Sequence, residues 1–250
     1  MIKKAIFITL LFIPLFAHTE QKNVGLCIMA TGKYIQFVMP LIESARKHFC
    51  IEHKITYFVF TDGLLPEAHD IVVIPQQRLG WPYDTMMRCK VYYDHKDVLQ
   101  TQDYIFALDA DMLFVGDMGN ELLSERVATF HPGYYGRKGP YESRSTSTAY
   151  LPEVQARFYF AGGFYGGSAQ EFIAINGTMS NNIQIDLNNN IVAVWHDESH
   201  LNRYFATHSP TMILTPDYCY PQSFPRDQVW LFQFKPRLLA LDKNHNEMRQ

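Results

Sequence analysis

The sequence lacks several patterns that would point to common protein classes. Charged residues make up only 19% of its 250 residues, the net charge is −3, and no long basic run occurs. A basic patch is the usual mark of a nucleic-acid-binding protein, so no nucleic acid partner is expected. The four cysteines are scattered, without any Cys-x-x-Cys pair, which excludes the common zinc spacings. Four buried free thiols are the simpler interpretation.

The N-terminus also lacks an apolar run of about 20 residues, the length that a membrane-spanning helix needs. The run over residues 5–17 is shorter and contains Pro14. It follows Lys3 and Lys4 and precedes polar residues, which is the plan of a secretory signal peptide. We therefore interpret residues 1–22 as a signal peptide or a short signal-anchor. This predicts a membrane-anchored or secretory-pathway protein that associates with a membrane through its N-terminus.

The remaining chain, residues 23–250, is predicted to fold as one α/β domain with a mostly parallel central sheet flanked by helices. Apolar residues make up 47% of the sequence, enough for a sizeable core. In the first half, strands are predicted at 24–30, 55–60, 70–75 and 104–108, and helices at 34–49 and 84–99. In the second half, we expect a strand at 127–130, a polar loop at 138–150, a glycine-rich strand or turn at 159–167, and helices at 169–180 and 197–208. The Asn-rich stretch 181–190 is predicted to be a loop or a linking helix end.

Two carboxylates follow the fourth predicted strand. Asp109 and Asp111 are one residue apart and come directly after the apolar run 104–108. Open α/β sheets bind ligands at the carboxyl ends of their strands. Carboxylate oxygens beside a phosphate site suit Mg²⁺ or Mn²⁺. Alone, this Asp-x-Asp pattern is equally compatible with a solvated turn.

A second cluster of polar and aromatic residues lies at the start of the last predicted helix. The segment Trp195–Asn202 contains Asp197, Glu198, His196 and His200. The two histidines are four residues apart, as in a zinc helix. A zinc peptidase needs Glu directly after the first histidine, where this chain has Asp197, so that interpretation is rejected. Upstream, the segment 161–167 is rich in glycine, which permits close backbone approach to a ligand or to a packed helix.

Seven segments together resemble one family. They occur in order along the chain as residues 30–34, 57–62, 109–111, 131–135, 162–167, 195–202 and 243–245. This pattern is similar to the family 6 glycosyltransferases, which include the histo-blood-group A and B transferases, α1,3-galactosyltransferase and Forssman synthase. The resemblance covers residues 24–250 and is most specific at Trp195–Asn202. It implies a GT-A type fold and identifies residues 23–250 as a catalytic domain.

The resemblance also implies roles for individual residues. Glu198 matches the catalytic acid on the reacting face of the sugar, and it also contacts the acceptor. The implied donor-binding residues are Thr31, Tyr34, Arg88, Asp109, Asp111, Ala161, Gly162, Gly163, Asp197, Lys243 and Arg249. The implied acceptor-binding residues are His131, Trp195 and Glu198. Asp109 and Asp111 would bind Mn²⁺ or Mg²⁺ and, through it, the diphosphate.

Specific positions bear on the substrates. In the family, glycine at the position of Gly163 is associated with room for an N-acetyl group, so Gly163 favours UDP-N-acetylgalactosamine over UDP-galactose. Asp109 and Asp111 are retained, whereas many bacterial relatives have asparagines there and work without metal. Metal dependence is therefore expected. Pro221 stands where an acceptor-contacting acid is expected, and the 136–147 loop is shorter than in the blood-group enzymes.

The predicted function is retaining transfer of N-acetylgalactosamine or galactose from a UDP-sugar to a β-galactoside oligosaccharide or glycoconjugate, in α1,3 linkage. A catalytically silent carbohydrate-binding protein of the same fold is the alternative. The retained Asp109, Asp111 and Glu198 argue against that alternative, because a lectin needs no diphosphate site.

Overall fold

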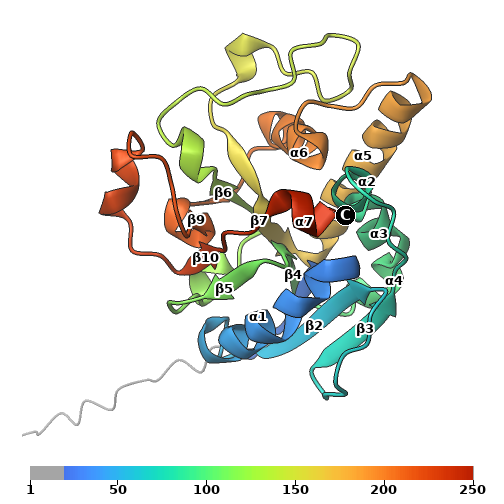
Figure 1. Cartoon of the computed structure of the whole chain (residues 1–250), viewed down its shortest axis with the longest axis vertical. Coiled ribbons are helices and arrows are strands. Elements are labelled where there is room, and N and C mark those ends of the chain that lie inside the picture. Colours follow the sequence, from blue (N-terminus) through green and yellow to red (C-terminus); the bar gives the residue numbers. More distant parts are fainter. Residues whose placement is uncertain (1–19, 250) are drawn as a thin grey trace, which may run out of the picture.

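A computed structural model describes residues 20–249, except the side chain of Arg249, and shows a large twisted sheet with helices on both faces (Figure 1). In spatial order, the strands of this sheet are β3 (Ile71–Pro75), β2 (Lys54–Thr61), β1 (Asn23–Met29), β4 (Tyr104–Asp109), β7 (Phe160–Ser168), β6 (Arg126–Phe130) and β8 (Met212–Leu214). Every neighbouring pair is parallel except the two that β7 makes. This confirms the predicted fold class, a mostly parallel α/β sheet of the GT-A type.

A small second sheet and a set of helices complete the domain. The small sheet contains β5 (Met112–Phe114), β10 (Leu238–Ala240) and β9 (Tyr220–Pro221), with β10 in the middle. The helices are α1 (Ile35–His48), α2 (Tyr83–Met86), α3 (Arg88–Asp94), α4 (Lys96–Leu99), α5 (Ala169–Asn188), α6 (His196–Thr207) and α7 (His245–Arg249). In Figure 1, α7 (red) lies in front of the central strands, which come from much earlier in the sequence.

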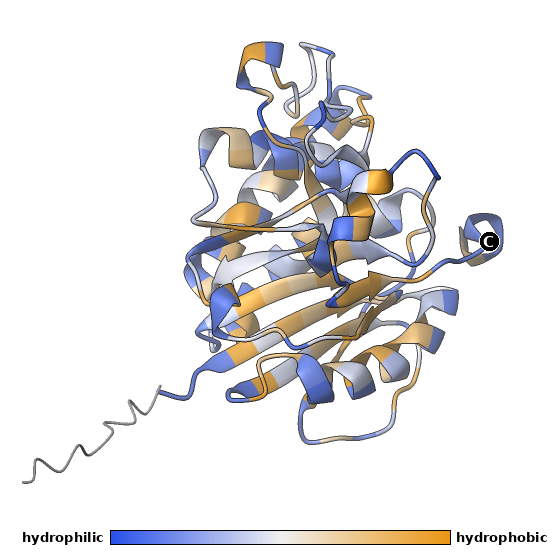
Figure 2. Ribbon diagram, turned by 90° about the vertical axis from the view of Figure 1, so that its left-hand side faces the viewer, coloured by the Kyte–Doolittle hydropathy of each residue, from blue (hydrophilic) through white to orange (hydrophobic). Residues whose placement is uncertain are grey.

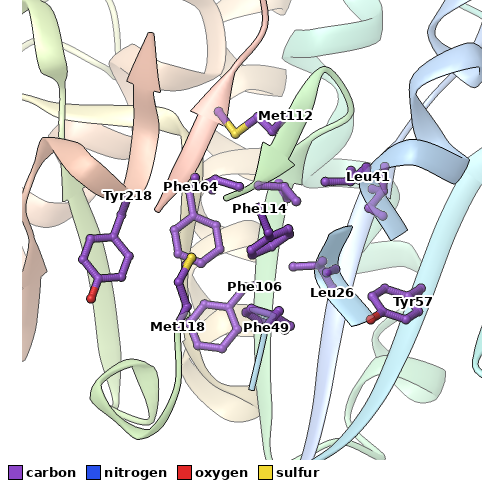
Figure 3. Packing of buried hydrophobic residues seen from close by; sticks show 14 of the residues in the cluster. Leu26, Leu41, Phe49, Tyr57, Phe106, Met112, Phe114, Met118, Phe164 and Tyr218 are labelled. Carbon is purple, nitrogen blue, oxygen red and sulfur yellow. The ribbon is translucent and has the colours of Figure 1, made fainter. Parts of the chain in front are cut away.

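The core consists of two apolar layers, one on each face of the large sheet. Successive residues of a strand point to opposite faces, and both faces are covered, so the central strands are apolar throughout (Figure 2). In β1, Leu26 packs toward α1 and the small sheet, and Cys27 packs toward α3 and α5. Figure 3 shows the first layer, where Phe49, Phe106 and Phe114 make close ring contacts. All four cysteines are buried and unbonded, as predicted.

Two predicted elements differ from the structure. The helix expected over 84–99 is divided into α2, α3 and α4, with the breaks at Met87 and His95. The Asn-rich stretch 181–190 was expected to be a loop or helix end, but α5 continues to Asn188. Two inward-facing residues explain the longer helix. Ile183 joins the core, and buried Asp186 accepts hydrogen bonds from the Ser147 hydroxyl and the Thr148 N–H.

Two features concern export and modification. The sequence Asn176-Gly177-Thr178 has the form of a glycosylation site. Asn176, however, is fully buried on α5 and its side chain is hydrogen-bonded to Tyr165 and Phe172, so it is inaccessible in the folded protein. The apolar run 5–17 lies outside the described residues. Within residues 20–249, no helix is both long enough and apolar enough to cross a membrane.

Candidate active site

The predicted site residues gather at one edge of the large sheet. Asp109 ends β4 and is paired with Met29, the last residue of β1. Because β7 runs antiparallel to β4, the beginning of β7 lies at this same edge, with Phe164 opposite Leu108. The segment Ala161–Gly163 is therefore next to Asp109. The strand topology thus brings a carboxylate and a glycine-rich backbone together where open α/β sheets bind ligands.

Arg88 connects four elements at the centre of this edge. It begins α3, and only 5% of the residue is exposed. Its guanidinium donates hydrogen bonds to Asp197 on α6 (2.5 Å), to Asp109 on β4 (2.5 Å) and to the Gly162 carbonyl on β7 (2.6 Å). Burial acts to lower the pKa of Arg88, but the charges of Asp197 and Asp109 outweigh this effect and raise it. Arg88 is therefore a permanent cation that fixes both carboxylates.

Asp197 is buried behind this arginine. The residue is 2% exposed, and burial raises the pKa of its carboxyl, against the opposing effect of the Arg88 charge. The backbone just before it is unusual, because His196 has a φ of 50°, in the left-handed region that residues other than glycine rarely adopt. Strained backbone of this kind is common at active sites. His196 is the first residue of α6, and Asp197 and Glu198 follow it directly.

Asp109 and Asp111 have the chemistry of a divalent-metal site. Each already faces a cation: Asp109 is paired with Arg88, and Asp111 is paired with the Lys243 ammonium from the C-terminal segment. Lys243 therefore holds a positive charge beside the carboxylate where a metal would bind. Two hard oxygen ligands fit Mn²⁺ or Mg²⁺, which commonly complete their coordination with water and substrate phosphates. Among residues 20–249, no cluster of three or more His, Cys, Asp or Glu side chains forms a site made of protein ligands alone.

Asp109 and Asp111 line a cavity of about 220 Å³. Six predicted donor residues line it: Thr31, Tyr34, Arg88, Asp109, Asp111 and Lys243. The Lys243 ammonium lies 5.3 Å from the centre of the Tyr34 ring, so the C-terminal segment closes over this cavity. The cavity combines an aromatic ring with charged groups of both signs. Such a lining suits a nucleotide diphosphate bound together with a metal.

A second cavity, of about 410 Å³, is also lined by both aspartates and by Lys243. The predicted residues His131, Ala161, Gly163 and Glu198 also line it. After the roles predicted for their residues, we call the first cavity the donor-side cavity and the second the acceptor-side cavity. Burial lowers the pKa of His131 to about 4, so its imidazole is neutral near pH 7. Its Nδ1 accepts the Gly133 N–H (3.1 Å), which leaves the proton on Nε2, where it can be donated to a ligand.

Glu198 is held by two hydrogen bonds at the boundary with β7. One carboxylate oxygen accepts the Tyr159 hydroxyl (2.7 Å), and the other accepts the Gly162 N–H (2.8 Å). Burial raises the pKa of Glu198 to about 7, although both hydrogen bonds act to lower it. Near neutral pH, both the ionised and the neutral form of Glu198 are therefore populated. A group of this kind in a cavity is a candidate for direct participation in a reaction.

The absence of a side chain at Gly163 keeps a small space open beside Asp109. A Cβ atom added at Gly163 would lie 2.8 Å from the terminal methyl of Met112, 3.2 Å from an Asp109 carboxylate oxygen and 3.3 Å from the Cys219 sulfur. A Cβ at Gly162 would lie 3.0 Å from the Arg88 guanidinium. A side chain at either position would therefore push on its neighbours, at Gly163 chiefly on the flexible end of Met112. Met112 and Cys219 share the wall of the acceptor-side cavity with Gly163.

The remaining predicted residues lie at the margin of the site. Trp195, directly before α6, is 46% exposed and lines neither of the two cavities. Arg249 ends α7, but its side chain is outside the described part of the structure. His196 and His200 do not form a pair: the His196 ring packs on Trp81, while His200 is buried against α5, with its Nε2 3.8 Å from Asp186.

Sequence reasoning missed several residues that line or support the site. Trp81, Asp84 and Thr85 line the donor-side cavity, and Met112 and Cys219 line the acceptor-side one. Tyr159 is 1% exposed and looks like an ordinary core aromatic in the sequence, although it binds Glu198. The glycine-rich segment directly after Tyr159 was the only sequence signal near it. None of these residue types carries a pattern that would have distinguished it from core.

Comparisons with known proteins show which family the sequence belongs to. The sequence profile described as Glycosyltransferase family 6 matches residues 7–250. Globoside alpha-1,3-N-acetylgalactosaminyltransferase 1 of Gallus gallus is 33% identical over 246 residues, which cover 91% of this chain and 69% of that protein. Histo-blood group ABO system transferase 1 of Rattus norvegicus is 34% identical over 244 residues, covering 92% and 69%. Alpha-1,3-galactosyltransferase 2 of Homo sapiens is 29% identical over 250 residues, covering 93% and 72%.

Proposed function

This chain belongs to glycosyltransferase family 6 and is a hexosyltransferase, and from this premise we propose that it moves N-acetylgalactosamine or galactose from a UDP-sugar to a β-galactoside in α1,3 linkage, with retention of configuration. One observation carries the proposal. Asp109 and Asp111 line both cavities, while Glu198 lines the acceptor-side cavity only. A diphosphate at the aspartates would therefore present its sugar to Glu198.

The donor-side residues would bind the nucleotide and its leaving group. Thr31 and Tyr34 would contact the uracil and ribose, and Asp109 and Asp111 would hold the diphosphate with Mn²⁺ or Mg²⁺. When bound, the metal would neutralise the negative charge that develops on departing UDP. Lys243 and Arg249 would add positive charge from the C-terminal segment. A closed C-terminal segment would also exclude water, which limits hydrolysis of the donor.

Glu198 would act on the face of the donor sugar opposite the leaving group. In retaining transfer, a carboxylate attacks C1 to form a glycosyl-enzyme, or it stabilises a positively charged sugar while the acceptor attacks from the leaving-group face. Both routes require the ionised carboxylate. The hydrogen bonds from Tyr159 and Gly162 favour that form and fix the orientation of both oxygens. Ala161 and Gly163 would contact the donor sugar, while buried Asp197 would act on this region through Arg88. His131 would contact the acceptor galactose, and Trp195 would contact it only where the acceptor extends beyond the acceptor-side cavity.

Gly163 supports N-acetylgalactosamine as the preferred donor sugar, because any side chain there would fill the space beside Asp109, Met112 and Cys219. The N-terminal segment, residues 1–22, would direct the catalytic domain at 23–250 into a secretory compartment or anchor it to a membrane.

A transfer assay tests the proposal. UDP-N-acetylgalactosamine and UDP-galactose are each offered to lactose and to 2′-fucosyllactose, with Mn²⁺ and with a chelator. We expect product in the Mn²⁺ reactions only, with N-acetylgalactosamine as the better donor sugar. Equal product with the chelator would contradict the metal role of Asp109 and Asp111. No product and no donor hydrolysis in any reaction would contradict the transferase and support a silent sugar-binding protein.

A further inference from the structure

One exposed acid in the lining of the acceptor-side cavity has an unpaired carboxylate. Asp242 lines this cavity together with His131 and Glu198. Its side chain is exposed, and within residues 20–249 it takes part in no hydrogen bond or ion pair. Every other acid named in this site has such a partner: Asp109, Asp111, Asp197 and Glu198. Asp242 is thus the acid of this cavity whose hydrogen-bonding capacity is unused.

The backbone of Asp242 is fixed on both sides. The N–H of the preceding Leu241 donates to the Asp111 carbonyl (2.9 Å), and the Asp242 N–H donates to the side-chain oxygen of Gln222 (2.9 Å). Gln222 is itself hydrogen-bonded through its N–H to the Ala240 carbonyl (2.8 Å). The carboxylate is therefore presented from an anchored position beside β9 and β10. A fixed position reduces the conformational cost of binding a ligand.

Adjacent residues of the C-terminal segment serve different sides of the site. Lys243 lines both cavities and pairs with Asp111, whereas Asp242 lines only the acceptor-side cavity. Asp242 does not complete a metal site, because the described residues contain no cluster of three or more metal-binding side chains. Of the two cavities, Asp242 can therefore meet only a ligand in the acceptor-side one.

The surroundings of Asp242 fit a neutral sugar. Pro221, Ala240 and Leu241 supply apolar wall next to the carboxylate. A pyranose has hydroxyl groups that donate hydrogen bonds and C–H faces that pack on apolar surface. Hydrogen bonds to a charged acceptor are about twice as strong as neutral ones. An anionic sugar would instead be repelled by the unpaired charge of Asp242, whereas Asp109 is already paired with Arg88.

We propose that Asp242 is an acceptor-binding residue whose carboxylate accepts hydrogen bonds from hydroxyl groups of a neutral acceptor sugar. The inference rests on the proposed function and adds a residue to it. Because Asp242 directly precedes Lys243, the same segment that closes on the diphosphate site completes the acceptor site.

The test is steady-state kinetics of the full chain and of Asp242→Asn, with lactose and with 2′-fucosyllactose. We expect the acceptor KM to rise about tenfold or more in Asp242→Asn. The donor KM and the rate of donor hydrolysis without acceptor should stay unchanged. Glu247→Gln is the matched control, because Glu247 is an exposed acid on the same segment that lines neither cavity. It should leave all constants unchanged.

An unchanged acceptor KM in Asp242→Asn, with the unaltered chain active, would overturn the inference and leave the proposed function standing. A rise of the donor KM, or loss of donor hydrolysis, would assign Asp242 to the donor side and also overturn it. If Glu247→Gln raised the acceptor KM as much as Asp242→Asn, the effect would come from the overall charge of the segment. This outcome would contradict a specific contact of Asp242 with the acceptor. No transfer to either sugar by the unaltered chain would contradict the proposed acceptor class, and this inference with it.

Discussion

At the scale of single residues, Glu198 is the group on which the proposed chemistry depends. Its carboxylate is fixed by Tyr159 and the Gly162 N–H inside the acceptor-side cavity. Glu198→Gln keeps the shape but removes the charge that, in the proposed mechanism, would face C1 of the donor sugar. We expect kcat to fall at least a hundredfold, while the Kd for UDP, measured by calorimetry, changes little. Near-normal turnover would remove Glu198 from the mechanism.

Tyr159 should control the pH dependence of Glu198. The pKa of Glu198 is raised to about 7, and ionised Glu198 is the active form, so kcat/KM should fall as the pH drops below about 7. Tyr159→Phe removes a hydrogen bond that favours the carboxylate. The pKa of Glu198 should therefore rise further, and the acid limb of the pH profile should move to higher pH.

Tyr141→Phe is the control for this experiment. The Tyr141 ring packs on Tyr159 with centroids 5.2 Å apart, but its buried hydroxyl has no hydrogen-bond partner among residues 20–249. The acid limb should stay in place in this variant. A profile that shifts equally in both variants would indicate a packing effect rather than the hydrogen bond.

Gly163 should influence the choice of donor. In Gly163→Ala the new methyl would press on the Met112 methyl and lie close to Asp109, which reduces the space for an N-acetyl group. We expect the kcat/KM ratio to shift toward UDP-galactose, by roughly tenfold for a group of this size. The double variant Gly163→Ala with Met112→Ala restores volume and should recover part of the original preference. An unchanged donor ratio in Gly163→Ala would refute the pocket argument.

Individual residues differed in how well the sequence predicted them. Asp109 and Asp111 drew notice because they directly follow an apolar strand, but that pattern alone was equally compatible with a solvated turn, and the family resemblance gave them their roles. Glu198 was found within a distinctive run. Tyr159 and Met112 were missed because an aromatic or thioether side chain in an apolar segment normally means core. Asp242 was missed because an isolated acid in a polar segment normally means surface. Its role depends on a cavity formed by segments distant in the sequence.

At the scale of elements, Arg88 holds together α3, β4, β7 and α6. Arg88→Ala would leave the Asp197 carboxylate buried without its cation. Removing one partner of a buried ion pair commonly costs about 3–5 kcal/mol, and we expect a loss of this size in the free energy of unfolding by urea. Arg46→Ala breaks a partly exposed pair with Asp70 and should cost less than about 1 kcal/mol. Equal losses in the two variants would contradict the structural role of Arg88.

The elements themselves were predictable where periodicity was strong. Strands β1, β2 and β4 lie close to their predicted ranges because buried parallel strands are continuous apolar runs. The region 84–99 was predicted as one helix but has breaks at Met87 and His95, which no glycine or proline announces. The Asn-rich stretch 181–190 was predicted to be a loop or a linking helix end, yet packing of Ile183 and Asp186 against other segments keeps α5 helical to Asn188.

At the scale of the whole molecule, the site is assembled from both ends of the chain. The sheet order places β1, β4 and β7 side by side, and the C-terminal segment returns across their ends to bring Lys243 to Asp111 (Figure 1). Alternation of strands and helices was enough to predict a mostly parallel α/β fold. The antiparallel insertion of β7 was not predictable from that pattern, and it is the feature that places Ala161–Gly163 beside Asp109.

The most direct test of the proposed reaction is the anomeric configuration of its product. The enzyme is incubated with UDP-N-acetylgalactosamine, Mn²⁺ and 2′-fucosyllactose, and the new glycosidic bond is examined by NMR before and after treatment with an α-specific glycosidase. We predict an α linkage to O3 of galactose, because in the proposed mechanism Glu198 would face the sugar opposite the departing UDP and the acceptor would take the position of UDP. A β-linked product would contradict the retaining mechanism and the role of Glu198 in it.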